Sequence, residues 1–258
     1  MLRQSKSLFE YPTQRRMWAH SIFFLRREAT LLTLLSQAQK VSMLHLMSGH
    51  AQLTKTGQKM LSDIAKLQAR HNLFMESLNT DLDMYDDQAT AGISSQKIYR
   101  GWREMGEVTL SQVHSVVGRV QQIEGSLTAL NTKVLEIQCS PFARGKSVDS
   151  LDSVICGSEE LYSSLRRKSK EQRSQKAENT EMCKLMVQAL RKRDRLHQDL
   201  YKHLEKQCEC LSEVAQLSTP LESVLQEIAR SAQNISNLQS KRQKDIWKIM
   251  EIAISRGQ

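Results

Sequence analysis

The chain has 258 residues, only 10 of them glycine and 3 proline, and aromatic residues make up 5% of it. This length can bury a sizeable core, and the composition argues against a sheet protein and for long helices. The formal net charge is +9, but lysine and arginine are interleaved with aspartate and glutamate along the chain. The densest basic cluster, residues 191–195, contains no aromatic or glycine residue, which is typical of a solvated helix face. We therefore expect no specific nucleic-acid binding.

Cysteine usage and hydropathy indicate the compartment. The five cysteines form no regular framework, and Cys208-x-Cys210 is neither a zinc nor a redox spacing, so we interpret all five as reduced thiols. The best apolar run, residues 21–25, is followed at once by two arginines and a glutamate, and no run approaches the roughly 18 residues of a membrane span. We expect a soluble protein without a membrane segment, located in the cytoplasm and, as a second compartment, in the nucleus.

The first long helix is predicted at 14–85, after a leading segment, 1–13, that stops at Tyr11-Pro12. No proline interrupts this helix, and Gly49 and Gly57 are the two candidate breaks. Its second half has residues at steps of three and four that are apolar except for one histidine, which is typical of a helix in a coiled coil. The residues of this pattern are Met60, Ile64, Leu67, His71, Phe74, Leu78, Leu82 and Tyr85.

Turn signals separate the helices that follow. Acidic and small residues at 86–92 predict a turn, and Ser140-Pro141 with Gly145 predicts a loop. Residues 169–179 are polar and without an apolar stripe, so we predict a flexible segment there. The last helix has a clear start signal, since Thr219-Pro220-Leu221-Glu222 combines a capping hydroxyl, a proline at the first helical position and a glutamate that completes a capping box.

Together these signals predict an all-α fold, an elongated bundle of a few very long antiparallel helices that resembles a coiled coil. One helical domain would occupy residues 14–256. Its helices are predicted at 14–85, 94–138, 149–167, 181–217 and 220–255.

The last three turns of the chain are more apolar than a bundle helix requires. On a helical wheel the apolar residues from Ile246 to Ile254 cover about 220°, whereas a stripe a little over 100° wide is enough to seal a core. Ile246, Ile249 and Ala253 can point into the bundle, while the other apolar residues fall beside them and would face out. Exposed Trp and Met in one patch favour a partner interface. The alternative is a terminal helix that is buried on both sides within its own domain. The outward residues are Trp247, Met250 and Ile254.

No catalytic constellation is present in the sequence. It has no glycine-rich phosphate loop, none of the protein-kinase motifs, no H-E-x-x-H and no G-x-S-x-G. We therefore assign no catalytic, cofactor-binding or metal-binding residue. His71, at a heptad position, is interpreted as a packed or partner-facing polar residue.

Three stretches carry a family resemblance. The first is Leu78–Tyr85 with residues 92–97 and Trp102–Met105; the second, weaker, is Ser140-Pro141 with residues 149–152 and 161–166; the third is Lys241–Ile249. In this order and spacing the chain resembles the scaffold/dimerisation domain of the IkappaB kinase catalytic subunits, alpha and beta, over about residues 18–256.

The resemblance implies a helical domain that follows a kinase domain and a ubiquitin-like domain and pairs two subunits, as a homodimer or as a heterodimer with a related subunit. It implies a dimer interface formed by the end of the last helix and the helix beside it. Leu73 stands where the family usually has an aromatic residue, and Met250 where it has a leucine, so a softer contact is expected. The implied interface residues are Ile246, Trp247, Met250, Lys66, Arg70, Leu73 and Ile93.

Two parts of the family would lie outside this chain: the kinase domain before it, and the tail that binds the regulatory subunit after it. ATP and magnesium are expected only at that kinase domain, a serine/threonine kinase of NF-kappa-B signalling. This chain would position two such kinase domains. The alternative function is a generic spectrin-like or coiled-coil tether without a kinase connection, which would pair along the first helix and not at Trp247.

Overall fold

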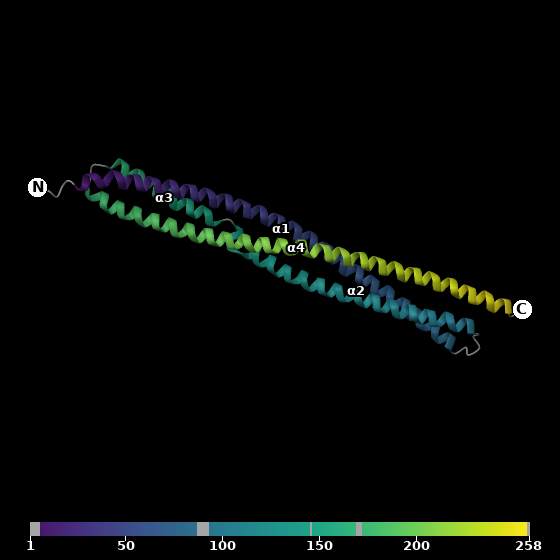
Figure 1. Ribbon diagram of the computed structural model, residues 1–258. Coiled ribbons are helices and arrows are strands. Elements are labelled where there is room, and N and C mark those ends of the chain that lie inside the picture. The colour runs from purple at the N-terminus through teal and green to yellow at the C-terminus, as the bar shows by residue number, and fades with distance from the viewer. Residues whose placement is uncertain (1–5, 87–92, 145, 169–171, 257–258) are drawn as a thin grey trace. The chain divides into compact units, whose positions relative to one another are not determined.

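Long helices make up nearly all of the described chain. The computed structural model describes residues 6–86, 93–144, 146–168 and 172–256, and within these ranges it contains no strand. The all-α prediction with a few very long helices is confirmed, since the first helix has 81 residues and the last has 85. The elements are α1 (Lys6–Asp86), α2 (Ile93–Cys139), the short 3-10 helix η1 (Pro141–Arg144), α3 (Lys146–Arg167) and α4 (Gln172–Arg256) (Figure 1).

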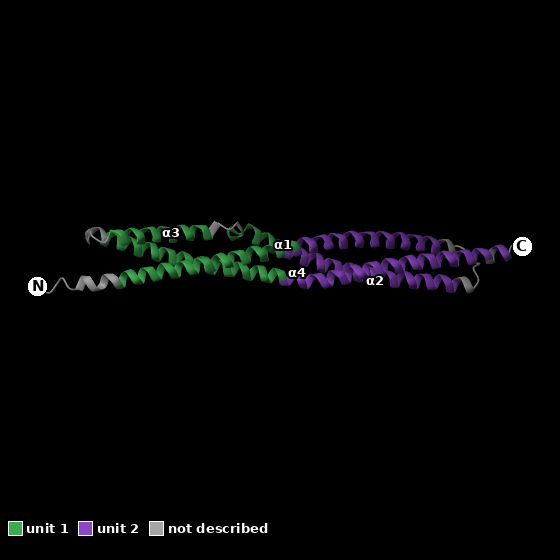
Figure 2. Ribbon diagram, turned by 90° about the horizontal axis from the view of Figure 1, so that it is seen from above, with its two compact units in different colours: residues 1–48, 133–211 green, residues 49–132, 212–258 purple. Residues whose placement is uncertain are grey.

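The helices form two compact units, and the segment predicted as one domain, 14–256, is divided between them (Figure 2). Unit 1 comprises residues 1–48 and 133–211, and unit 2 comprises residues 49–132 and 212–258. Each unit therefore contains part of α1, part of α2 and part of α4, and unit 1 also contains α3.

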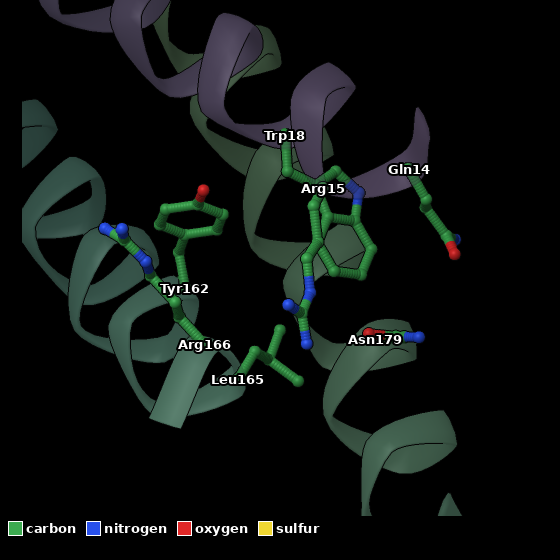
Figure 3. Close-up of a pocket in the computed structure, with 7 residues that line it drawn as sticks. All are labelled: Gln14, Arg15, Trp18, Tyr162, Leu165, Arg166 and Asn179. Carbon is green, nitrogen blue, oxygen red and sulfur yellow. The ribbon is translucent and has the colours of Figure 1, made fainter. Parts of the chain in front are cut away.

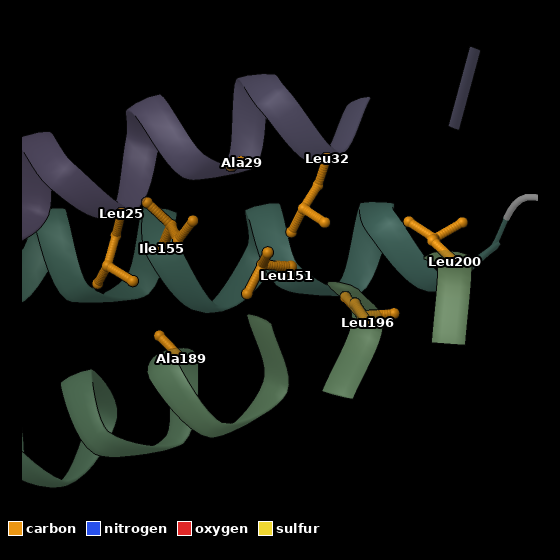
Figure 4. Close-up of a cluster of buried hydrophobic side chains, with 8 residues drawn as sticks. All are labelled: Leu25, Ala29, Leu32, Leu151, Ile155, Ala189, Leu196 and Leu200. Atoms are coloured by element: carbon orange, nitrogen blue, oxygen red, sulfur yellow. The ribbon is translucent and has the colours of Figure 1, made fainter. Parts of the chain in front are cut away.

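The core of unit 1 is built between α1, α3 and α4. Leucine, isoleucine and alanine side chains from the three helices pack between them along several turns (Figure 4). A second cluster extends the core toward the start of α1 and consists of Trp18, Ile22, Leu165, Met182 and Met186. The first cluster consists of Leu25, Ala29 and Leu32 from α1, Leu151 and Ile155 from α3, and Ala189, Leu196 and Leu200 from α4.

The core of unit 2 follows the heptad pattern of the sequence. The predicted α1 positions from Met60 to Leu78 are all buried, His71 included, and Leu82 is half-buried. The side chain of Tyr85 lies outside the described residues. Facing side chains come from α2 and α4, among them Trp102, Val113, Leu221 and Ile235. Each such side chain contributes about 1.5–3 kcal/mol when it leaves water, so this stripe holds the unit together.

The first two helices of unit 2 are antiparallel, as predicted. Gly57 of α1 faces Leu127 of α2, and further along α1 Leu78 faces Gly106 of α2. The residue numbers of the contacting positions therefore decrease along α2 as they increase along α1, so the two helices run in opposite directions.

Helices α1 and α4 run in the same direction within unit 2. Val214 of α4 lies against Gly49 of α1, and Arg242 of α4 pairs with Asp81 of α1. The contacting positions therefore rise together along both helices. Three mutually packed helices cannot all be antiparallel, so one parallel pair is unavoidable, and the antiparallel arrangement predicted for the bundle does not extend to α1 and α4.

The predicted breaks in α1 are absent. The helix begins at Lys6, not at residue 14, and it passes through Pro12. It also passes through Gly49 and Gly57 without a break. Glycine at position 57 instead lets α2 approach α1 closely, since a Cβ there would lie 2.7 Å from Cδ1 of Leu127.

The boundary predicted at Pro220 is wrong, because α4 runs unbroken from Gln172 to Arg256 with Pro220 inside it. An interior proline removes one backbone hydrogen bond and costs about 3 kcal/mol. Pro220 is exposed, however, and buried Leu221 and Val224 continue the apolar stripe directly after it. Packing of that stripe outweighs the local stop signal.

The remaining bounds differ by smaller amounts. Helix α2 begins one residue before the predicted 94, and α3 begins at Lys146, not at 149. Helix α4 begins at Gln172, so most of the segment predicted as flexible, 169–179, is helical. An ion pair of 3.1 Å between Lys168 Nζ and Glu178 Oε1 ties this first part of α4 to the end of α3.

Candidate dimer interface

The end of α4 presents apolar side chains to solvent. Trp247 is 61% exposed, Met250 is 49% exposed and Ile254 is 66% exposed, as the helical wheel predicted. Ile246 and Ile249 are half-buried, and the side chain of Ala253 lies outside the described residues. The outward residues are spaced by three and four, so they share one face of the helix.

A shielded polar contact fixes this part of α4 against α1 within unit 2. Arg242 Nε lies 3.0 Å from Asp81 Oδ2, and the same guanidinium donates a hydrogen bond to the hydroxyl of Ser77. It also lies 6.0 Å from the ring centroid of Phe74. The side chains of Arg242 and Asp81 are only 15% and 21% exposed, so solvent has little access to this ion pair.

That contact brings the predicted α1 and α4 residues to within a few helical turns of each other. Leu73, 64% exposed, lies one turn before Ser77, and Trp247 lies five residues after Arg242. We call Leu73, Ile246, Trp247 and Met250 the Trp247 patch. Exposed apolar residues of this kind are typical of an interface, where aromatic residues and methionine are enriched.

Two further predicted residues lie on α1 before Leu73. Lys66 and Arg70 are exposed, and Lys66 stands one heptad before Leu73. Lys66 Nζ is 3.1 Å from Asp63 Oδ1 of the same helix, an exposed pair that contributes little to stability. Ile93 is the first residue of α2, and its side chain lies outside the part of the chain that the structure describes.

The described residues hold no metal-binding cluster and no membrane-spanning helix, and unit 1 has a very small pocket. They contain no group of three or more His, Cys, Asp or Glu side chains that could hold a metal ion. None of the helices in the described ranges has a stretch long and apolar enough to cross a bilayer. Figure 3 shows a pocket in unit 1 with an interior of about 10 Å³, room for roughly one water molecule and not for a nucleotide. Its lining is Gln14, Arg15, Trp18, Tyr162, Leu165, Arg166 and Asn179.

Each unit has a buried histidine in its core. His71 in unit 2 is 3% exposed, and burial lowers its pKa; a hydrogen bond with Asn72 opposes this shift, and the charge of His114 adds a smaller lowering. Burial also lowers the pKa of His203 in unit 1, as does the charge of Lys206. Both imidazoles are therefore packed in the neutral form, which agrees with the interpretation of His71 as a packed polar residue.

A second apolar surface was missed in the sequence. Along the first half of α1, large apolar side chains lie opposite the buried residues Leu25, Ala29 and Leu32, and they are exposed. The sequence could have indicated this surface, because its apolar side chains recur on the outward side of the helix whose inward side carries the buried residues. We call them the α1 outer face. Its members are Met17, Phe23, Phe24, Leu31, Leu34, Val41 and Leu44.

Comparison with known proteins identifies the family. A family model described as "IQBAL scaffold dimerization domain" matches residues 1–255. The chain is 29% identical over 257 residues to the Inhibitor of nuclear factor kappa-B kinase subunit alpha of Xenopus tropicalis, and 29% identical over 260 residues to that of Gallus gallus. It is 29% identical over 262 residues to the subunit beta of Mus musculus.

These alignments cover 100%, 100% and 99% of this chain, but 34%, 33% and 33% of the respective relatives. The chain thus spans about a third of the length of the curated relatives it matches.

Proposed function

The chain belongs to the scaffold dimerization domain family of the IkappaB kinase subunits, and from this premise we propose that the Trp247 patch is the surface through which it pairs. The partner is a second copy of this chain or a related kinase subunit. In the full-length protein, the pair would hold two kinase domains in a fixed relation, so that one can reach the activation loop of the other. We propose further that the full-length protein is a serine/threonine kinase that phosphorylates an inhibitor protein in NF-kappa-B signalling.

The exposure of Trp247 is the observation that carries the proposal. A tryptophan buries 150–250 Å² when it is covered, and tryptophans are enriched among residues that dominate binding energy. Here its side chain is largely exposed beside Met250, while Ile246 and Ile249 on the inward side of the same helix are half-buried. Covering this patch with a second copy removes apolar surface that the unit itself leaves in water.

The direct test introduces charges into the patch. Ile246→Asp combined with Trp247→Asp would bury two unpaired charges in a dimer, at a cost of several kcal/mol. By light scattering we expect the mass to fall from twice the chain mass of 29.6 kDa to that mass itself. The matched control is Tyr201→Asp, which charges an equally exposed aromatic residue, 62% exposed, in unit 1.

The control variant should remain a dimer, and circular dichroism should show full helix content in both variants. A wild-type chain that is monomeric at high concentration, or a doubly charged variant that stays dimeric, would refute the proposal.

We also propose that the α1 outer face contacts another domain of the full-length protein, the kinase or the ubiquitin-like domain that the resemblance implies. Its exposed apolar residues lie among Arg16 and Arg27, which suits a partly acidic partner surface. Leu31→Asp with Leu34→Asp should abolish binding of those domains added in trans, while leaving the dimer mass unchanged. Unchanged binding in this variant would show that the α1 outer face is not the contact surface for those domains.

We propose residence in the cytoplasm and the nucleus, to be checked by imaging a tagged chain. We likewise propose that ATP and magnesium bind only to the kinase domain. Calorimetric titration of this chain with ATP and magnesium should then give no binding heat, and a saturable signal would contradict the assignment.

A further inference from the structure

We propose that the Arg242–Asp81 pair sets the register of α4 against α1 in unit 2 and thereby positions the Trp247 patch for the partner. Only the last step, the effect on pairing, rests on the proposed function. The setting of the register does not depend on the proposed function.

Both residues occupy positions where the helix pattern calls for an apolar side chain. On α4 the buried residues Ile228 and Ile235 recur at intervals of seven, and Arg242 is the next member of that series. On α1 the buried Phe74 is followed seven residues later by Asp81. A charged pair thus replaces an apolar layer at one level of the core.

Apolar layers alone do not define how two long parallel helices are aligned. A shift by seven residues brings a similar apolar side chain to each position, so the packing energy changes little. A polar residue at one core position removes this ambiguity at some cost in stability. After such a shift Arg242 would lose both the carboxylate of Asp81 and the hydroxyl of Ser77, and a shielded charge left without a partner is strongly unfavourable.

A second ion pair of unit 2 does not have this role. Arg119 and Glu227 join α2 to α4, and their side chains are 40% and 36% exposed, so solvent screens the charges. The Arg242–Asp81 pair joins α1 to α4 and is much more shielded.

A change of register would alter the patch. Sliding α4 by seven residues moves Trp247 by about 10 Å relative to Leu73, at 1.5 Å per residue. The α1 and α4 parts of the patch would then no longer have the spacing that a second copy must match.

The experiment compares three double variants of the full chain. Asp81→Leu with Arg242→Leu replaces the pair by an apolar layer, and such replacements are often neutral or stabilising, so the variant should fold. Asp81→Arg with Arg242→Asp exchanges the charges. Arg119→Leu with Glu227→Leu removes the more exposed ion pair between α2 and α4 and is the matched control.

Two readouts separate register from pairing. Spin labels at Thr80→Cys and Gln243→Cys, with the exposed native cysteines changed to serine, report the distance between α1 and α4. Sedimentation reports the dimer dissociation constant. We expect the leucine variant to show a second distance population, shifted by about one heptad, and a dissociation constant raised about tenfold. The control and the charge-exchanged variant should keep one narrow population and the wild-type constant.

A leucine variant with one narrow distance population and an unchanged dissociation constant would overturn the proposal. So would a charge-exchanged variant with a broad distribution, because the effect would then come from the shape of residue 242 and not from the pair. If the wild type is monomeric yet the leucine variant is broadened, the register assignment stands and the proposed dimerisation falls.

Discussion

The two units differ in charge as well as in where they leave apolar surface. Unit 1 contains 23 lysine and arginine residues against 14 acidic ones, and unit 2 contains 14 of each, so the whole net charge of +9 lies in unit 1. Unit 1 exposes its apolar side chains mainly along α1, whereas unit 2 exposes them mainly at Leu73, Val108 and the end of α4. A neutral unit suits pairing with an identical copy, because like charges would otherwise repel across the symmetric contact. A basic unit suits a different, acidic partner.

The largest expected effect tests whether the two cores are equally tight. Leu151→Ala in unit 1 and Leu130→Ala in unit 2 each remove a side chain that is fully buried. Each should lower the free energy of unfolding by about 2–5 kcal/mol. Denaturant unfolding measures the loss, and hydrogen exchange locates it. If protection falls equally in both units after either change, the division into two units has no energetic meaning.

A gain of stability is expected in unit 2 from Pro220→Ala. The change restores a backbone hydrogen bond and removes a ring clash inside α4, and the side chain is exposed, so packing is untouched. We expect the free energy of unfolding to rise by about 1–3 kcal/mol, measured by urea titration. A loss of stability would mean that α4 needs the bend that proline introduces.

A smaller effect tests the charge difference. Weak, non-specific binding of the chain to DNA should fall steeply with salt. Arg191→Glu with Arg195→Glu in unit 1 should weaken this binding about threefold to tenfold in fluorescence anisotropy, because fewer phosphates are neutralised. The matched change in unit 2, Lys244→Glu with Lys248→Glu, should have less effect. Equal losses would show that the charge imbalance does not determine anion binding.

The smallest expected effect is a loss of folding stability at acidic pH. The pKa of His71 and that of His203 are lowered by burial, so below pH 6.5 the unfolded chain binds protons that the folded chain does not. The stability that these groups contribute should therefore be complete above about pH 7 and decline as the pH falls below 6.5 toward the folded-state values. His71→Leu should reduce this decline when thermal unfolding is followed from about pH 7.5 to 5.5. An identical decline in the variant would assign it to other groups.

Much of this structure follows from helix periodicity alone. The stripe from Met60 to Leu78 and the outward face at Trp247 and Met250 were predictable, because a helix places residues on its faces by spacing. The breaks expected at Gly57 and Pro220 were not found, since the packing of a continuous stripe outweighs a local signal. The pairing of Asp81 with Arg242 could not be predicted, because it depends on the alignment of two helices far apart in sequence.

The close contacts of Gly57 and Gly106 have a consequence for how α1 and α2 tolerate change. In each helix the glycine leaves a space above the backbone, and a leucine of the opposite helix fills that space. The two notches look equivalent, yet Leu127 is half-buried and can swing toward water, whereas Leu78 is fully enclosed by its neighbours. A change of Gly57 to alanine is therefore tolerated, because Leu127 can move aside. The same change at Gly106 forces α1 and α2 apart, because Leu78 cannot move.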